Sequence, residues 1–202
     1  MKNTNAISGI KLNALFDILE EYGIQKTKFL DSLQIAPSLF ESHDKKLTVN
    51  QLSRLLEQAV LITGNEDLGL LIGERSRYLP NIVCYIMMNC LTVGIALEKY
   101  SHYKRIFSDE TNVKLNEHTL GFSLEMCSLI SDYSTFKAFN DFKLASMFVF
   151  LRFLTGGTFA LKEVAVRHSK PNNSAAYERL FACPVTFSQP FNALIFSKDS
   201  LN

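Results

Sequence analysis

Arg152 is the residue whose type and position most clearly suggest chemistry. It is a permanent cation within the apolar run 147–154 of an expected helix. A guanidinium in such surroundings needs an acidic partner or a path to solvent. Three interpretations follow: an ion pair with a protein acid such as Glu125 or Glu163, a side chain that extends to the surface, or an anchor for an acidic group of a ligand.

His168 is the second candidate. It alternates with Val164 and Val166, so the three side chains share one face of an expected strand. A histidine on an apolar face is either a hydrogen-bonded core residue or a ligand contact. If this strand packs on the helix that carries Arg152, the two side chains would face a shared interior, although the spacing alone does not require it.

Aromatic and methionine side chains at helical spacing supply candidates for the wall of an apolar cavity. Tyr85 and Met88 belong to one expected helix, Tyr103 to the next, and Phe122 to a strand. Such stripes also occur simply as core packing. The predicted ligand-binding set comprises Arg152, His168, Tyr103, Tyr85, Met88 and Phe122.

Patterns of catalysis, metal binding and cofactor binding are not found. The sequence has no serine elbow, phosphate loop, dinucleotide-binding glycine pattern or paired acids on one helix. The cysteines lie in apolar runs without the pairing of a disulfide frame or a zinc site, and without basic neighbours that would favour a thiolate: Cys84, Cys90, Cys127 and Cys183. We therefore expect no enzyme, no metal and no cofactor.

The composition is that of a globular protein with little net charge. The 202 residues are 47% hydrophobic, and 21 bases against 20 acids give a net charge of +1. This charge creates no field that would attract a polyanion. The N-terminus has no apolar leader, and the longest apolar run is too short to span a bilayer and contains Arg152. We expect a cytoplasmic protein without a membrane partner.

Residues 1–108 are expected to be mainly helical. Thr48 and Gln51 form a capping box, which predicts a helix start. The helices within residues 11–35 also imitate a helix-turn-helix, but bases and acids balance over residues 1–64, whereas a major-groove reader normally has a basic face. Helical periodicity extends over residues 10–22, 27–33, 48–62, 67–74, 83–89 and 92–107.

Residues 109–202 are expected to form an antiparallel sheet with helices. Alternating apolar residues on both sides of His118-Thr119 predict a hairpin. Residues 136–154 form a long helix, apolar nearly all round from Leu144 onward, which predicts a central buried helix.

The last part of the chain is expected to complete this sheet. The strand through His168 is followed by a short helix capped by Ser174, and then by two strands that pair with each other around Gln189-Pro190. The fold class is α+β, with one domain over residues 1–202 in which a helical half packs against an antiparallel sheet and a central buried helix.

Several weak motifs, in order and at consistent spacing, resemble the N-terminal regulatory domain of the AraC/XylS family of bacterial transcription regulators, in its arabinose-binding-like branch. The resemblance covers nearly the whole chain. Its marks are Leu68-Gly69-Leu70 with Gly73, Ala96-Leu97 with Tyr100 and Tyr103, Arg152-Phe153-Leu154-Thr155-Gly156, Val164, Val166, His168 and Pro171, Ala176-Tyr177-Glu178, Phe181, Cys183-Pro184-Val185 and Phe187, and Asn192, Leu194 and Phe196.

The sequence departs from the family pattern in two places. Residues 81–84 replace glycines expected there, so the neighbouring pocket wall would differ in shape. Family members continue into a domain with two helix-turn-helix units, whereas this chain ends at Asn202. We therefore expect the sensor alone, as a fragment or a truncated protein, that reaches DNA only through the missing C-terminal domain.

The preferred interpretation is a bacterial sensor domain that binds a small effector in a mostly apolar cavity and dimerises. Arg152 favours an anionic effector with an apolar body, and the helix at residues 92–107 could supply a dimer face. The alternatives are a dimerisation or protein-interaction module without a ligand, a small enzyme, and direct DNA binding through the N-terminal helices.

Overall fold

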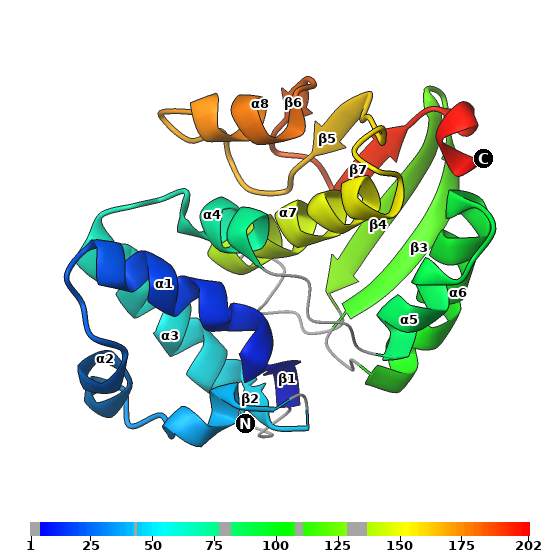
Figure 1. Ribbon diagram of the computed structural model, residues 1–202. Coiled ribbons are helices and arrows are strands. Elements are labelled where there is room, and N and C mark those ends of the chain that lie inside the picture. The colour runs from blue at the N-terminus through cyan, green and yellow to red at the C-terminus, as the bar shows by residue number, and fades with distance from the viewer. Residues whose placement is uncertain (1–4, 43, 77–81, 108–110, 129–136) are drawn as a thin grey trace.

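The computed structural model describes residues 5–42, 44–76, 82–107, 111–128 and 137–202 (Figure 1). Its first helices form a lobe of residues 5–76, here called the helical lobe. They are α1 (Asn13–Glu21), α2 (Lys26–Ser32), α3 (Val49–Thr63) and α4 (Leu68–Arg75), joined by 3-10 turns at Gly9–Leu12 and Pro37–Phe40. The mainly helical start of the chain is confirmed.

Local signals in the sequence define helix α3 closely. Thr48 and Gln51 form the predicted capping box. Thr48 Oγ1 accepts from the main-chain N–H of Gln51, and Gln51 Oε1 accepts from the main-chain N–H of Thr48. Gly64 ends the helix at φ 64°, a left-handed conformation in which glycine is unstrained. A good cap at each end makes the boundaries of α3 predictable from sequence.

A small sheet in the helical lobe is not predicted from the sequence. Strand β1 (Asn5–Ser8) pairs antiparallel with β2 (Lys46–Thr48). The charged stretch before Thr48 therefore ends in a strand. The cause is a pairing between segments about 40 residues apart, which local periodicity cannot reveal.

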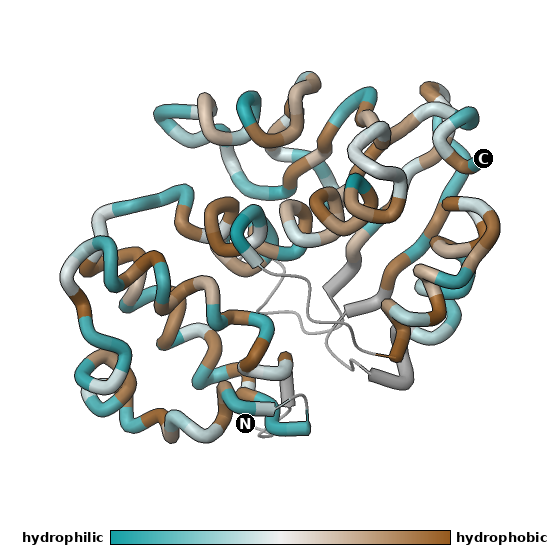
Figure 2. Tube along the Cα trace, in the orientation of Figure 1, coloured by the Kyte–Doolittle hydropathy of each residue, from teal (hydrophilic) through white to brown (hydrophobic). Residues whose placement is uncertain are grey.

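Helix α7 (Lys137–Leu154) is the central helix of the molecule, as predicted. Its first turns bury Ala138, Phe139 and Phe142 in the core of the helical lobe. Its remaining turns belong to a second core, shared with the sheet. Figure 2 shows apolar residues all along α7. The helix therefore contributes to both cores, and any rearrangement between the two parts of the molecule must act on it.

Helix α4 lies unusually close to α7. At Gly69 an added Cβ would overlap the Ala138 carbonyl, and at Gly73 it would lie 2.8 Å from the Phe142 carbonyl oxygen. The two glycines are one turn apart on one face of α4, so they allow the helix backbones to touch. This contact joins the helical lobe to the rest of the chain.

The five-stranded sheet has the order β3-β4-β7-β5-β6. The predicted hairpin is present as β3 (Thr111–His118) and β4 (Gly121–Ser128). Helices α5 (Ile82–Met88) and α6 (Val93–Phe107) pack beside β3, and residues 77–81 lie outside the described part of the chain. With α7, the sheet and its helices form what is here called the sheet lobe, residues 82–202 (Figure 1).

The edge of the sheet differs from the prediction in its pairing. Strand β7 (Asn192–Phe196) lies between β4 and β5 (Glu163–Ala165), and β6 (Val185–Thr186) pairs parallel with β5. The predicted pairing of the last two strands is therefore wrong, and the sheet is mixed rather than purely antiparallel. The crossover through α8 (Ala175–Phe181) brings the short β6 to the outside.

The fold class is α+β, as expected from the sequence. No helix within the described ranges is both long and apolar enough to span a bilayer.

Candidate functional site

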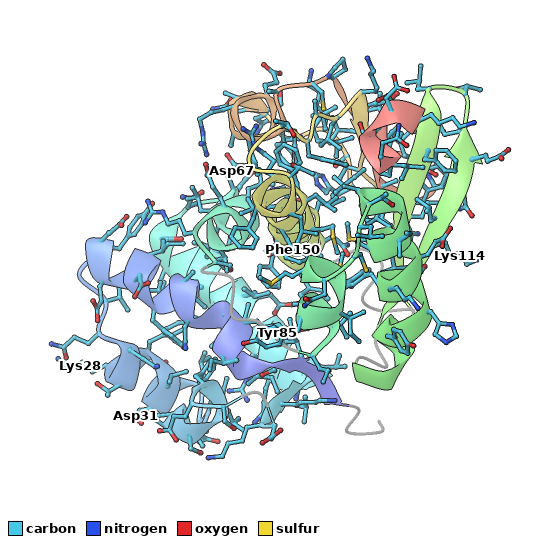
Figure 3. All side chains as sticks on the ribbon, turned by 45° about the vertical axis from the view of Figure 1, so that its right-hand side comes forward. Lys28, Asp31, Asp67, Tyr85, Lys114 and Phe150 are labelled. Atoms are coloured by element: carbon cyan, nitrogen blue, oxygen red, sulfur yellow. The ribbon has the colours of Figure 1, made fainter. Side chains whose placement is uncertain are left out.

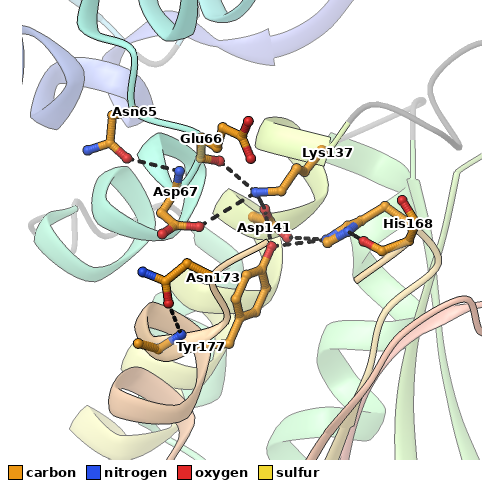
Figure 4. A network of polar contacts seen from close by, with 10 residues as sticks. Asn65, Glu66, Asp67, Lys137, Asp141, His168, Asn173 and Tyr177 are labelled. Atoms are coloured by element: carbon orange, nitrogen blue, oxygen red, sulfur yellow. Dashed lines mark hydrogen bonds and ion pairs between the residues drawn. The ribbon is translucent and has the colours of Figure 1, made fainter. Parts of the chain in front are cut away.

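A buried carboxylate, Asp141, is the centre of a polar network between the two lobes (Figure 4). Its side chain on α7 is fully buried. Asp141 Oδ1 lies 3.2 Å from His168 Nε2, and Oδ2 lies 2.7 Å from the Tyr177 hydroxyl and 3.0 Å from Lys137 Nζ. A buried charge is tolerated only when it is paired and hydrogen-bonded, and Asp141 meets both conditions.

Tyr177 and His168 connect this carboxylate to helix α8 and the loop before it. Burial, and next to it the charge of Asp141, raises the pKa of Tyr177 above its usual value. The phenol therefore stays protonated and donates to Asp141. The two nitrogens of His168 face oxygen acceptors, the Ser169 carbonyl at 2.8 Å and Asp141. These two contacts attach the loop before α8 to α7.

Lys137 connects the same carboxylate to the helical lobe. It lies one turn before Asp141 on α7, and its Nζ donates to the Glu66 carbonyl oxygen at 2.6 Å. The carboxylate of Asp67, at the start of α4, is 3.8 Å from the same nitrogen. Residues from three segments, 66–67, 137–141 and 168–177, thus meet at one point.

An open hollow of about 420 Å³ adjoins this network. Its wall combines residues of the helical lobe with the loop before α8, and they are Tyr22, Thr63, Gly64, Asn65, Glu66, Asp67, Asn172 and Asn173. The wall is polar, with amide, hydroxyl and carboxylate groups, and includes no lysine or arginine. The hollow therefore offers hydrogen bonds and negative charge to a small polar molecule that touches both lobes.

Asp67 is the residue of the hollow whose pKa is clearly shifted. Burial raises the pKa of this carboxyl above its usual value, although the charge of Lys137 acts in the opposite direction. Oxygen Oδ1 is enclosed and has no hydrogen-bond donor within reach among the residues that the structure describes. Asn65 uses its side-chain oxygen to accept from the Asp67 amide at 2.9 Å, which holds the loop that presents the carboxylate.

A second link between the lobes lies on the surface. Arg179 of α8 donates two hydrogen bonds to the carboxylate of Glu74 on α4, at 2.7 and 2.6 Å. The hydrogen bonds from Arg179 lower the pKa of Glu74. Bidentate pairs have defined geometry, so this pair sets the position of α8 against α4.

The structure does not bring Arg152 and His168 together. Arg152 is exposed, and its guanidinium lies 5.8 Å from the centre of the Phe148 ring. It is three helical turns, or about 16 Å, along α7 from the Asp141 that binds His168. Arg152 lies at the surface, which agrees with one of the three interpretations given for it. The prediction that it shares an interior with His168 is wrong. Its role toward a ligand remains a prediction.

The other predicted wall residues are divided between surface and core. Tyr85 and Met88 are 53% and 42% exposed, and Figure 3 shows Tyr85 on the side of α5 away from the sheet. Tyr103 and Phe122 are partly buried against the second core. His168 lies beyond the end of β5, in a bend, rather than on the strand. The set does not converge on one point.

Three members of the polar network were missed from the sequence. Lys137 and Asp141 are four residues apart in a helical segment rich in phenylalanine. This spacing of opposite charges within an apolar segment is a detectable signal for a paired buried charge. Tyr177 was noted only as part of a family motif. Ser174 occupies the N-cap position of α8, as predicted, but its side chain makes no capping hydrogen bond, and Asn173 Oδ1 accepts from the Ala175 main-chain amide instead.

The described residues contain no group of histidine, cysteine and acid side chains that could hold a metal ion. Burial raises the pKa of the Cys183 thiol to about 11, so this sulfur is a poor nucleophile at neutral pH.

The same fold occurs in a solved bacterial protein. The crystal structure of the transcriptional regulator CdpR from Pseudomonas aeruginosa matches 87% of this chain with a TM-score of 0.59 at 16% identity, over 54% of its own length.

The chain belongs to the family described as the N-terminal arabinose-binding domain of AraC transcription regulators, whose profile matches residues 23–202. The Ornithine utilization regulator of Pseudomonas aeruginosa is 22% identical over 191 residues, which are 93% of this chain and 56% of that protein. The chain thus spans just over half the length of the relatives it matches.

Proposed function

We propose that this chain is the effector-sensing domain of a cytoplasmic AraC-type regulator, which controls DNA binding by a domain that follows it in the full-length relatives. The observation that carries the proposal is the hollow of about 420 Å³ between the lobes. A molecule bound there contacts the helical lobe and the loop before α8 together. It therefore favours whichever arrangement of the lobes binds it better, and this shift in population is the signal.

The proposed role involves no chemical reaction. The polar groups with the most buried positions, Asp141 and Tyr177, bond to each other rather than to an open site. Arrangements of this kind fix the relative position of helices, as a sensor needs. Membership in a family of regulators supports the same conclusion.

The position of Arg152 supports an anionic, apolar effector only weakly, because an exposed guanidinium lies outside any enclosed space. The polar wall of the hollow instead suits a small polar effector. The relative whose name refers to ornithine utilization points to amino acids with a second amino group as the first compounds to test.

The second candidate is an interaction module without a small ligand. Its specific support is an apolar strip on α5, the following turn and the first turn of α6, with exposed fractions of 58% for Ile82, 94% for Leu91 and 40% for Ile95, beside Tyr85 and Met88. Residues 82–97 contain no charged residue, so two copies of the strip do not repel each other. We place the homodimer contact there. Tyr100 and Tyr103 of α6 are partly buried in the core, which leaves less of α6 for this contact.

A thermal-shift screen distinguishes the two candidates. The 202-residue chain is tested against ornithine and other amino acids, sugars, fatty acids and aromatic acids, with Arg152→Ala in parallel. A sensor gains stability from its effector by mass action, so its Tm rises with ligand concentration. A chain that no compound stabilises, and that dimerises in sedimentation experiments, is the interaction module instead.

A further inference from the structure

The charges around the hollow are unbalanced. Its wall includes the carboxylates of Glu66 and Asp67 and no cationic side chain. The nearest cation, Lys137, lies 3.0 Å from Asp141 and donates to the Glu66 main-chain oxygen, so its charge is already shared. Glu66 is exposed, and its carboxylate is in no ion pair among the described residues. The hollow therefore presents negative potential that Lys137, which is 3.8 Å from the Asp67 carboxylate and also paired with Asp141, offsets only in part.

One acceptor in the wall is enclosed by protein and lacks a donor. Asp67 Oδ1 has less than 1 Å² of accessible surface and no hydrogen bond within the described part of the chain, and its distance of 3.8 Å to Lys137 Nζ exceeds hydrogen-bond range. About three quarters of the Asp67 side chain is buried, and the rest is open to the hollow. Because Oδ1 itself is enclosed, a ligand in the hollow would meet the open part of the Asp67 side chain and act on the carboxylate through its charge.

The opposite wall supplies neutral groups. Asn172 and Asn173 come from the loop before α8, and the side-chain oxygen of Asn173 is occupied by the Ala175 amide at 3.0 Å. The hollow thus combines carboxylates on the helical lobe with carboxamides on the sheet lobe, which suits a ligand with an ammonium group and a second polar group.

We propose that the hollow binds a small organic molecule through a primary ammonium group, held by Glu66 and Asp67, with the rest of the molecule against Asn172 and Asn173. This proposal rests on the proposed sensor function and names the ligand class of its site. An ammonium has three donors and a compact charge, so it can pair with both carboxylates at once. Binding would connect Asp67, at the start of α4, to the loop that leads into α8.

The test uses four compounds with the same carbon chain, measured by isothermal titration calorimetry on the 202-residue chain. They are 1,4-diaminobutane, 4-aminobutyrate, butylamine and butyrate. We expect the three amines to bind, at least tenfold more tightly than butyrate. Glu66→Gln keeps the shape of the side chain and removes its charge, and we expect it to weaken the amines about tenfold or more. Asp67→Asn should weaken them similarly.

Glu57→Gln is the matched control, because Glu57 is an exposed acid on α3 outside the hollow. It changes net charge equally and should leave affinity within about twofold. Amine binding that Glu66→Gln and Asp67→Asn leave unchanged would place the ligand elsewhere and overturn the inference, while the sensor function stands. A second outcome would also overturn the inference and leave the sensor function standing: no amine binds, and an acid stabilises the unchanged chain but not Arg152→Ala. A chain that binds none of the compounds in either screen would remove both proposals.

Discussion

At the scale of single residues, Asp141 is the group on which most polar contacts depend. Replacing it with alanine leaves the Tyr177 hydroxyl, Lys137 and His168 without their common acceptor inside the protein. Breaking a buried pair in this way costs about 3–5 kcal/mol. We expect Asp141→Ala to lower the free energy of unfolding in urea by about 3 kcal/mol. Tyr177→Phe removes one hydrogen bond and should cost only about 1–2 kcal/mol. Equal losses in the two variants would contradict the central role of Asp141.

Asp67, unlike Asp141, is expected to lower the stability of the folded chain at neutral pH. Its pKa is raised in the folded state, chiefly by burial, so folding disfavours the ionised form. The resulting destabilisation is absent below the ordinary pKa of the carboxyl and develops as the pH rises through the raised value. Asparagine resembles the protonated acid. We expect Asp67→Asn at pH 7 to lower the free energy of unfolding by less than about 0.5 kcal/mol, or to raise it.

Urea denaturation of Asp67→Asn at pH 7 and near pH 4 checks this sign. The free energy of unfolding of the variant, relative to that of the unchanged chain, should be higher at pH 7 than near pH 4. A clear loss at pH 7 would show that Asp67 is kept for its pair with Lys137. The expected result would mean that the chain retains a charge that does not help it fold, which is typical of residues selected for binding.

At the scale of secondary structure, the contact between α4 and α7 determines how the lobes join. A methyl group at Gly73 would overlap Ala145 and crowd the Phe142 carbonyl. The helices must then separate, and overpacking of this kind costs about 1–3 kcal/mol. We expect Gly73→Ala to lower the midpoint of thermal unfolding and to weaken the effector response, because α4 carries the Asp67 end of the hollow. An alanine at exposed Glu57 on α3 is the control and should have little effect.

At the scale of the whole molecule, the uncharged apolar strip on α5 predicts self-association. Leu91 is 94% exposed, so a charged residue there costs the monomer little. In a symmetric dimer the two lysines of Leu91→Lys would meet across the interface, or lie close to it. We expect the dissociation constant in analytical ultracentrifugation to rise at least tenfold. The circular dichroism spectrum should stay unchanged. An unaltered dimer would place the interface on another surface.

Much of the fold follows from local patterns. The capping box at Thr48, the hairpin turn after His118 and the apolar surface of residues 137–154 are properties of short windows, because caps, turns and helical periodicity act over a few residues. Local patterns also mark Arg152 and His168 as polar residues within apolar segments. What sequence alone could not supply was their partners.

The sequence by itself determined the α+β class, the order of the main helices and of the hairpin strands, and a composition without a strong charge. Tertiary structure alone decided that β6 runs parallel to β5 and that Arg152 reaches solvent. It also decided that the Asp141 carboxylate forms polar contacts with His168, Tyr177 and Lys137. The physical reason is distance along the chain. Glu66, Asp141 and Asn172 become neighbours only when two helices and a sheet edge pack together, and no local preference encodes that meeting.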